Sequence, residues 1–301
     1  MFIVNIGVDG GGTKTCLLAS DASDQIWSDE GAAANPRIVG IERSSTVLSG
    51  LIDRAIDQYP DAREFRICAG IAGAATSSLH NALTDSVKLD LRSPAGISLK
   101  ITDDATIAYE AAFEGAPGVL LVVGTGSMIL VRTLDGSFFR SGGWGYLLGD
   151  EGSGYSLGRA GLRAVAASID ANEPTALTTR AASELEVTTR EALLDKVYGS
   201  SYSLASFAPA VLDEAGKGDA TSATIVDREI RKLVDRLHML TEGLERNLPG
   251  IIKVAGGLSK SRPYMLTLSD VVTERFAGWE VTRSGRESVE GALWLAKQMS
   301  D

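Results

Sequence analysis

Apolar and polar residues alternate along the chain in a pattern that predicts strands separated by helices. Residues 2–8 are mostly apolar, break at a run of glycines, and are followed by a second strand-like run at 14–20. Two strands joined by a tight glycine and threonine turn predict a β-hairpin. Residues 118–133 repeat this arrangement, and a short aromatic strand follows them. We therefore expect an internal duplication of one α/β unit.

Strands and helices are expected to alternate in the rest of the chain. The further strands are expected at 65–71, 97–102, 250–255 and 279–282. The expected helices lie at 42–58, 78–88, 105–114, 154–169, 222–247 and 287–299, with a longer polar, helical stretch over 175–220. This alternation predicts a mostly parallel sheet covered by helices, so the expected fold class is α/β. The best candidate for a domain boundary is Pro117-Gly118.

Composition restricts the classes of partner. The 301 residues are 44% hydrophobic, enough for a core, and their formal net charge is −10. Such a protein repels nucleic acid and anionic membranes unless its basic residues cluster, and the sequence shows no such cluster. Cys16 and Cys68 lie in apolar runs without a CxxC spacing, which argues against a disulfide scaffold or a thiolate metal cluster. With no signal peptide or spanning segment expected, the expected compartment is the cytoplasm.

Glycine is in excess, with 33 residues against roughly 21 for an average composition, and the excess falls in four segments. The first segment consists of Asp9, Gly10, Gly11, Gly12, Thr13, Lys14 and Thr15. Bare backbone N–H groups can approach an anion there, hydroxyls can donate to it, and the carboxylate at the strand end can hold Mg²⁺ with its waters. The segment matches neither a Walker loop nor a dinucleotide fingerprint, and a plain hairpin turn is the alternative.

The second glycine segment is the turn of the repeated hairpin. It consists of Gly124, Thr125, Gly126 and Ser127. Such a turn is common, so its value as evidence comes from the repetition of the first loop. Two hairpins that face each other could clasp a triphosphate from both sides, and domain closure would then belong to the mechanism.

Two aspartates follow the strand expected at 97–102. Open α/β sheets place active residues where a strand ends and a helix begins, as at Asp103 and Asp104. Either aspartate could simply cap the helix that follows. If both serve the function, Asp103 caps or positions, and Asp104 faces the cleft and accepts the proton of an attacking hydroxyl.

The third and fourth glycine segments suggest contacts with rings. Residues 142–154 hold six glycines, Trp144 and the acidic pair Asp150-Glu151. A tryptophan face can stack on a sugar ring while a carboxylate accepts hydrogen bonds from its hydroxyls, although the acidic pair also suits a helix N-terminus. The Gly256-Gly257 step ends a strand and suits a flat ring on bare backbone, or a simple strand-to-helix turn.

In their order and spacing, these motifs resemble the N-acetylglucosamine kinase / BadF-BadG-BcrA-BcrD ATPase family of the sugar kinase, actin and Hsp70 superfamily. The resemblance covers residues from about 4 to 297 and includes the terminal run Glu290-Gly291-Ala292-Leu293. It implies two ribonuclease-H-like (actin-like ATPase) domains with ATP in the cleft between them. The expected domains are 1–116 and 117–286, with a C-terminal helix over 287–301 that returns to the first domain.

The resemblance also implies roles for individual residues. Asp9 would lie at the Mg²⁺, the two hairpin turns would bind phosphate, Gly256 and Gly257 would form the adenosine motif, and Asp104 would be the catalytic base. The positions that match those around an amino sugar are Asn35, Ala72, Gly73, Asp104, Trp144 and Asp150. On sequence alone, Asn35-Pro36 also fits an ordinary loop. One departure is Met128, which stands where the similar kinases most often carry Asn.

The expected function is therefore an ATP-dependent kinase that phosphorylates the 6-hydroxyl of an amino sugar, N-acetylglucosamine or glucosamine. The cofactors would be ATP and Mg²⁺, and the resemblance implies a homodimer. Two alternatives are an ATPase that drives a conformational change in a partner protein, and a non-catalytic sensor of a sugar or nucleotide. The segment from Trp144 to Asp150 favours the kinase, since a pure ATPase needs no sugar platform.

Overall fold

The chain divides into two compact units, each of which contains one mixed sheet. The computed structural model describes residues 2–23, 25–74, 76–92 and 96–300. The N-terminal unit comprises Met1–Gly115 and Ser284–Asp301, and the C-terminal unit comprises Ala116–Arg283. The expected α/β class is confirmed, because helices and strands alternate in both units.

The sheet of the N-terminal unit has the strand order β3-β2-β1-β4-β5. Its strands are β1 (Ile3–Gly10), β2 (Lys14–Ser20), β3 (Ile26–Ala32), β4 (Glu64–Ile71) and β5 (Ile97–Asp103). The first three strands pair antiparallel, whereas β1, β4 and β5 run parallel. The sequence pattern did not predict β3. This edge strand is partly exposed along its whole length, so it lacks the apolar run that marks a buried strand.

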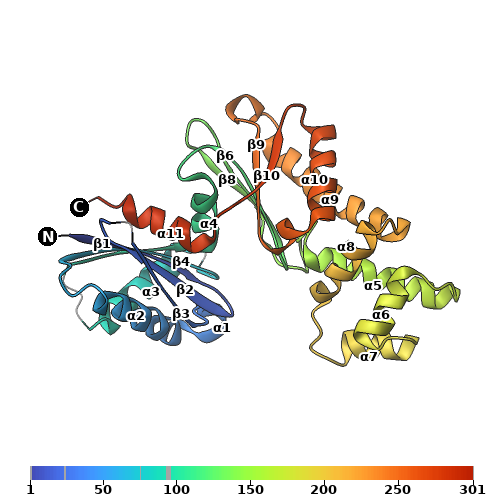
Figure 1. Ribbon diagram of the computed structural model, residues 1–301, viewed down its shortest axis with the longest axis horizontal. Coiled ribbons are helices and arrows are strands. Elements are labelled where there is room, and N and C mark those ends of the chain that lie inside the picture. The colour runs from blue at the N-terminus through green and yellow to red at the C-terminus, as the bar shows by residue number, and fades with distance from the viewer. Residues whose placement is uncertain (1, 24, 75, 93–95, 301) are drawn as a thin grey trace. The chain divides into compact units, whose positions relative to one another are not determined.

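The helices of the N-terminal unit include one from the far end of the chain. They are α1 (Pro36–Val39), α2 (Ile41–Asp57), α3 (Ser77–Asp90), α4 (Asp104–Phe113) and α11 (Ser288–Lys297). In Figure 1 the red helix α11 lies beside α4 and β1, although the whole C-terminal unit separates them in sequence. A returning C-terminal helix is what the family resemblance implied.

Glycines allow α11 to come unusually close to its neighbours. A Cβ atom on Gly7 of β1 would overlap the backbone of Leu293, and one on Gly291 of α11 would overlap the carbonyl oxygen of Ile107. The helix is therefore seated backbone against backbone, which leaves no room for even one methyl group.

The sheet of the C-terminal unit repeats the first topology. Its order is β10-β9-β6-β7-β8, with β6 (Gly118–Val123), β7 (Ser127–Arg132), β8 (Phe138–Gly142), β9 (Ile251–Ala255) and β10 (Glu280–Arg283). Strands β6, β7 and β8 pair antiparallel, and β6, β9 and β10 run parallel. The two sheets thus have the same order and strand directions, as a duplication would produce.

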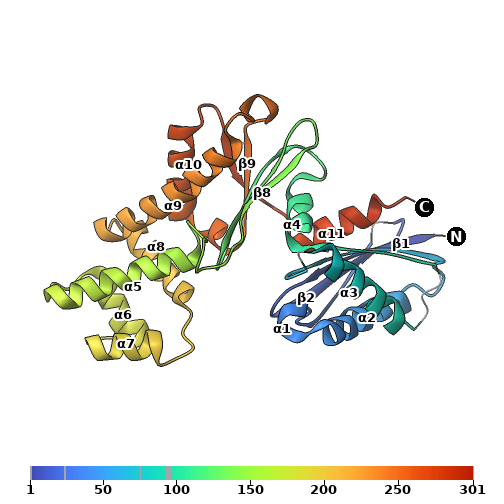
Figure 2. The same cartoon turned by 180° about the vertical axis from the view of Figure 1, so that it is seen from behind.

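Helices cover this second sheet and extend beside it (Figure 2). They are α5 (Gly154–Ala171), α6 (Ala176–Leu185), α7 (Arg190–Tyr198), α8 (Ala208–Gly216), α9 (Ala220–Thr241) and α10 (Arg262–Arg275), with the 3-10 turns η1 (Leu204–Phe207), η2 (Glu245–Asn247) and η3 (Gly257–Lys260). The prediction of a single helix over 222–247 was wrong at the C-terminal end. The helix stops at Thr241 because Gly243 adopts a left-handed conformation with φ +81°.

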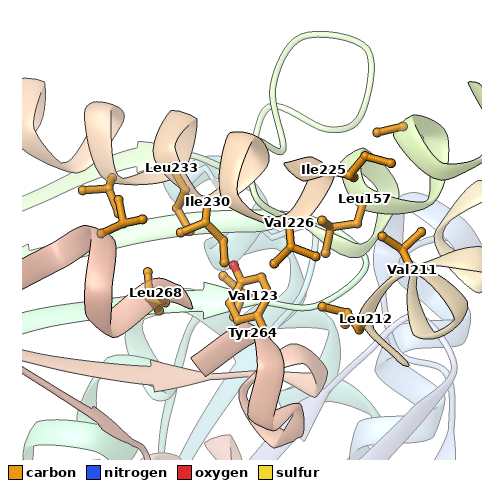
Figure 3. Packing of buried hydrophobic residues seen from close by; sticks show 14 of the residues in the cluster. Val123, Leu157, Val211, Leu212, Ile225, Val226, Ile230, Leu233, Tyr264 and Leu268 are labelled. Atoms are coloured by element: carbon orange, nitrogen blue, oxygen red, sulfur yellow. The ribbon is translucent and has the colours of Figure 1, made fainter. Parts of the chain in front are cut away.

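The core of the C-terminal unit joins these helices to the sheet. Figure 3 shows side chains of α5, α8, α9 and α10 packed around Val123 of β6. Tyr264 of α10 is fully buried there, and burial raises the pKa of its phenol. Its hydroxyl donates a hydrogen bond of 2.8 Å to the carbonyl oxygen of Gly152. One core side chain thereby holds the end of the glycine-rich segment.

Cys68 belongs to the buried part of the N-terminal unit. Cys68 is buried in β4, and burial raises the pKa of its thiol to about 12, so it acts as an apolar core residue. Within the ranges described, no helix is both long enough and apolar enough to cross a membrane.

Substituting Gly7 tests the close seating of α11. We expect Gly7→Ala to lower the free energy of unfolding by about 1–3 kcal/mol, because β1 and α11 must move apart. Urea unfolding measures this change. Gly285→Ala is the matched control, since its Cβ would meet no atom within 4 Å, and it should change stability by less than about 0.5 kcal/mol. Equal unfolding midpoints for the two variants would contradict the packing argument.

Candidate active site

Parallel strands bring the acidic candidates of the N-terminal unit to one edge of the sheet. In the strand register, Asp9 of β1 lies beside Gly70 of β4, and Ile71 lies beside Asp103 of β5. The carboxyl ends of the three parallel strands therefore meet, and Asp104 follows at the first position of α4. This is the edge at which open α/β sheets bind their ligands.

The first glycine turn presents an exposed tip on a fixed base. The base is held by neighbouring backbone, because Gly10 accepts a hydrogen bond from the Ala72 N–H at 2.9 Å and Gly11 accepts one from the Ala34 N–H at 3.1 Å. Gly12 and Thr13 are exposed at the tip. A small anion can reach the tip, as a phosphate-binding turn requires.

The last two residues of this turn are already engaged. The Lys14 ammonium pairs with Glu30 of β3 at 2.6 Å. Thr15 is buried, and its hydroxyl donates to the carbonyl oxygen of Ala32 at 2.7 Å. The structure therefore separates the expected loop residues: Gly12 and Thr13 are open to a ligand, whereas Thr15 stabilises the pairing of β2 with β3.

The two aspartates at the start of α4 have different surroundings. Asp103 caps the helix, since its carboxylate accepts a hydrogen bond from the Thr106 N–H at 2.8 Å. Asp104 is half-buried, and its Oδ1 accepts from the Ala105 N–H at 3.0 Å. The capping role thus belongs to Asp103.

The electrostatic environment of Asp9 is strongly perturbed. The pKa of Asp9 is raised from 3.8 to about 6, mainly by burial and also by the nearby charges of Asp104 and Glu287, whereas Lys14 lowers it. Sequence reasoning missed Glu287, which caps α11 and reaches this edge because α11 returns to the first sheet. Its position as the first residue of the helix expected over 287–299 was the only mark of it in the sequence.

This donor set suits Mg²⁺ better than a metal enclosed by protein ligands. In the described part of the chain, no group of three or more His, Cys, Asp or Glu side chains could hold a metal ion. Mg²⁺ keeps several waters and takes one or two carboxylates together with substrate phosphates. Asp9, whose pKa is raised by burial and by the nearby charge of Asp104, would be stabilised in its ionised form by a cation and fits that pattern.

The residues of the N-terminal unit that the family resemblance implies for sugar binding lie close together. Asn35 caps α1 through a hydrogen bond from the Arg37 N–H at 2.9 Å, and a Cβ on Gly73 would overlap the Asn35 side chain. Gly73 has φ +79°, and its carbonyl oxygen accepts from Arg37 Nε at 2.8 Å. Ala72 precedes it and bonds to Gly10, so this group adjoins the first glycine turn. No motif had pointed to Arg37.

In the C-terminal unit, the second glycine turn is tied to the segment 142–154. The Ser127 N–H donates to Asp150 Oδ1 at 3.0 Å, and its hydroxyl donates to the Glu151 carbonyl at 2.7 Å. Gly124 accepts from the Gly154 N–H at 2.8 Å, at the start of α5. Asp150 is buried in the left-handed region with φ +66°. The structure therefore places the Asp150 carboxylate against the second glycine turn, whereas the family resemblance implied a place for it around the amino sugar.

An ion pair connects the segment 142–154 to α9. Arg236 of α9 pairs with the Glu151 carboxylate at 2.6 Å, and both side chains are largely buried. In contrast, Trp144 is 72% exposed, so its indole face is open for stacking. Sequence reasoning missed Arg236, because nothing near it in the chain marks a functional residue.

The two glycines of the last motif, Gly256 and Gly257, differ in how much space surrounds them. Gly256 has φ +93°, and a Cβ there would overlap the backbone of Val123, so glycine is required by the pairing of β6 with β9. A Cβ on Gly257 would meet nothing within 4 Å. Because β6 and β9 run parallel, this motif and the turn that begins at Gly124 share one sheet edge.

The order of these motifs agrees with a known family. Residues 6–296 match the model of the BadF/BadG/BcrA/BcrD ATPase family. The chain belongs to this family. The membership inferred from the glycine motifs is thereby confirmed.

Relatives in this family match along their whole length. The chain is 30% identical to an N-acetylmuramic acid/N-acetylglucosamine kinase of Clostridium acetobutylicum, over 98% of this chain and 99% of the relative. It is 28% identical to an N-acetyl-D-glucosamine kinase of Dictyostelium discoideum, over 97% of each. The names of these relatives agree with the prediction of an ATP-dependent sugar kinase.

Solved structures share the fold at lower identity. A protein of Chromobacterium violaceum assigned as an N-acetylglucosamine kinase superposes with a TM-score of 0.74 and 24% identity, over 97% of this chain and 98% of that one. A ROK family glucokinase of Streptomyces griseus, solved with glucose and AMPPNP, gives 0.59 and 18% over 98% of each. The two-domain actin-like ATPase fold is thus confirmed.

The charge on Asp9 should cost stability in the absence of ligands. A carboxyl group whose pKa is raised in the folded protein stabilises it at low pH, and this contribution is lost as the pH rises through about 6. We therefore expect Asp9→Asn to raise the free energy of unfolding by up to about 3 kcal/mol near pH 8 in EDTA, and hardly at all near pH 4.

Urea unfolding at the two pH values measures this effect. The exposed Asp61→Asn serves as the control for loss of one charge on the N-terminal unit. A gain from Asp9→Asn of the same size at both pH values would show that the ionised carboxylate is not its cause.

Proposed function

We propose that this protein is an ATP-dependent kinase that phosphorylates the 6-hydroxyl of N-acetylglucosamine, with glucosamine as the alternative acceptor. The observation that carries the proposal is the sheet edge of the N-terminal unit, where Asp104 and Asp9 lie beside an exposed glycine turn. The full-length similarity to two N-acetylglucosamine kinases supports the choice of acceptor.

Phosphate binding is assigned to the two glycine turns. Backbone N–H groups around Gly12 and Thr13 can donate to phosphate oxygens, and so can those of the turn from Gly124 to Ser127. Asp9 would hold Mg²⁺, which when bound neutralises charge on the phosphates. Gly257, with open space above its backbone, is assigned to the adenosine.

The acceptor sugar is assigned to residues that present hydrogen-bonding groups and one aromatic face. Asn35 and the Ala72-Gly73 backbone lie beside the first turn and would orient the hydroxyls of the ring. Trp144 would stack on its C–H face. Asp150 would contribute mainly by holding the Ser127 N–H, since its carboxylate is already bonded there.

The proton of the attacking hydroxyl is assigned to Asp104. Asp104 is the first residue of α4, and Asp103 caps the helix, so the Asp104 carboxylate is not needed as the cap. A carboxylate that accepts the hydroxyl proton as the oxygen attacks the γ-phosphate is the usual base of such a transfer.

One observation favours a second candidate, an ATPase that acts on a partner protein. Next to Trp144, the side chains of Tyr146, Leu147 and Leu148 are also exposed, by 54%, 80% and 77%. Such an apolar group suits contact with another protein. The homodimer implied by the family resemblance stays a prediction, as does a cytoplasmic location.

Release of ADP separates these functions. With saturating ATP and Mg²⁺, the kinase predicts ADP release that depends on N-acetylglucosamine or glucosamine, and ³¹P NMR of the product identifies the hydroxyl. ADP release at the same rate without any sugar would reject the kinase in favour of the ATPase. Binding of sugar and ATP without release would indicate the sensor.

Substituting the two aspartates of α4 tests the base. We expect Asp104→Asn to lower kcat by about 10²- to 10⁴-fold, with little change in the Kd for the sugar. Asp103→Asn is the matched control, because asparagine caps a helix about as well as aspartate, and it should keep most of the turnover. The base would be misassigned if Asp104→Asn turned over at a near-normal rate.

A further inference from the structure

A groove between α5 and α9 in the C-terminal unit gathers positive charge. The cavity has a volume of about 750 Å³. Its charged lining consists of Arg159 and Arg163 from α5, and Arg228, Glu229 and Lys232 from α9. Four cations and one carboxylate give a formal charge of +3, in a protein whose net charge is −10. A groove of this sign attracts anions that the rest of the protein repels.

The helix packing creates this concentration of charge. Leu157 of α5 and Ile225 of α9 belong to the buried cluster shown in Figure 3, and Ile225 also lines the groove. Each helix places two cations four residues apart, which is an unfavourable spacing for like charges on a helix. Small side chains, among them Ala160 and Ala164, leave room between the helices.

The cations of the two helices differ in their pairing. Glu229 is buried, and its Oε1 accepts from Arg228 Nε at 3.2 Å and from Lys232 Nζ at 2.8 Å. One carboxylate thus fixes both cations of α9. Arg159 and Arg163 have neither an ion-pair nor a hydrogen-bond partner anywhere in the described ranges. Two guanidinium groups therefore remain available to a ligand.

The hydroxyl groups of the groove indicate what else the ligand carries. Thr224 donates its hydroxyl proton to the Ala220 carbonyl at 2.8 Å, and Ser156 donates its proton to the Ser153 carbonyl at 2.9 Å. Both oxygens keep lone pairs that can accept hydrogen bonds. The groove thus offers cationic donors for an anion and neutral acceptors for hydroxyl groups.

We propose that the α5–α9 groove binds the phosphomonoester of a small polyhydroxylated molecule, a sugar phosphate. Guanidinium forks match the oxygens of a phosphate dianion, and a dianion makes use of both Arg159 and Arg163, whereas a monocarboxylate needs only one of them. The volume lies in the range of small-molecule sites. The acceptors Ser156 and Thr224 take the hydroxyl groups of the sugar.

The groove adjoins the second glycine turn through α5. The first N–H groups of that helix, from Gly154 and Tyr155, donate to the carbonyls of Gly124 and Thr125 at 2.8 and 3.0 Å. Ser156 and Arg159, which line the groove, follow within the next turn. A bound ligand therefore restrains the helix that holds the turn. The regulatory part of this inference, control of the kinase by its own product class, rests on the proposed function.

Calorimetric titration of the full chain tests the binding. The probes are N-acetylglucosamine 6-phosphate, inorganic phosphate and N-acetylglucosamine, with saturating ADP and N-acetylglucosamine present during the two phosphate titrations. We expect the sugar phosphate to bind at one further site and more tightly than phosphate. Arg159→Gln and Arg163→Gln should each weaken this binding about tenfold or more.

Arg246→Gln is the matched control, since it removes the same charge from an exposed turn of the same unit, and it should leave the binding unchanged. Equal weakening by Arg163→Gln and Arg246→Gln would overturn the inference, and so would phosphate binding as tightly as the sugar phosphate. Urea unfolding of both arginine variants should show intact folding, because each substitution removes a like-charge neighbour.

Two further outcomes are informative. If sedimentation shows that Arg163→Gln separates a dimer while no probe binds the parent protein, the groove is a contact between copies and the inference fails. The binding result does not depend on kinase activity. A protein that binds the sugar phosphate but phosphorylates no sugar would refute the proposed function and leave the site standing.

Discussion

The close seating of helix α11 is the constraint on which the N-terminal unit depends. Gly7 and Gly291 let the helix backbone touch β1 and α4, where any side chain would collide. This contact closes the unit with residues from the opposite end of the chain, and it brings Glu287 near Asp9. The electrostatics of the candidate active site therefore depend on a packing contact made by glycines.

The two glycine turns have the same topology but different supports. The first is held by backbone hydrogen bonds from Ala72 and Ala34, on the segments that follow β4 and β3. The second is held by the start of α5 and by Asp150, which in turn belong to a segment fixed by Arg236 and Tyr264. The two sheets share one strand order, whereas the segments that follow their strands differ, so each turn has its own surroundings.

The negative net charge of this protein does not indicate how well it can bind anions. The chain is acidic overall, yet the glycine turns offer backbone N–H groups whose affinity for phosphate needs no positive side chain. The α5–α9 groove uses the opposite means and concentrates cations. It also corrects the inference that basic residues do not cluster: they are dispersed in sequence but gathered in space.

The sequence by itself determined those features whose cause is local. The hairpins with their glycine turns, the parallel strands that follow, and the aspartates at the start of α4 all follow from neighbouring residues, and the order of these motifs indicated the family. Local patterns failed at β3, whose exposed edge carries no apolar run, and at the end of α9, where Gly243 ends the helix before an apolar pattern ceases.

Only the tertiary structure decided which distant residues meet. Glu287 lies near Asp9, and Arg236 forms an ion pair with Glu151, although long stretches of chain separate the partners. In the same way, cations from α5 and α9 line one groove. Likewise, Thr15 turned out to be buried and bonded, although its place in the glycine turn resembles that of the exposed Thr13. Burial and charge proximity arise only when helices and sheet pack, and sequence spacing does not encode those distances.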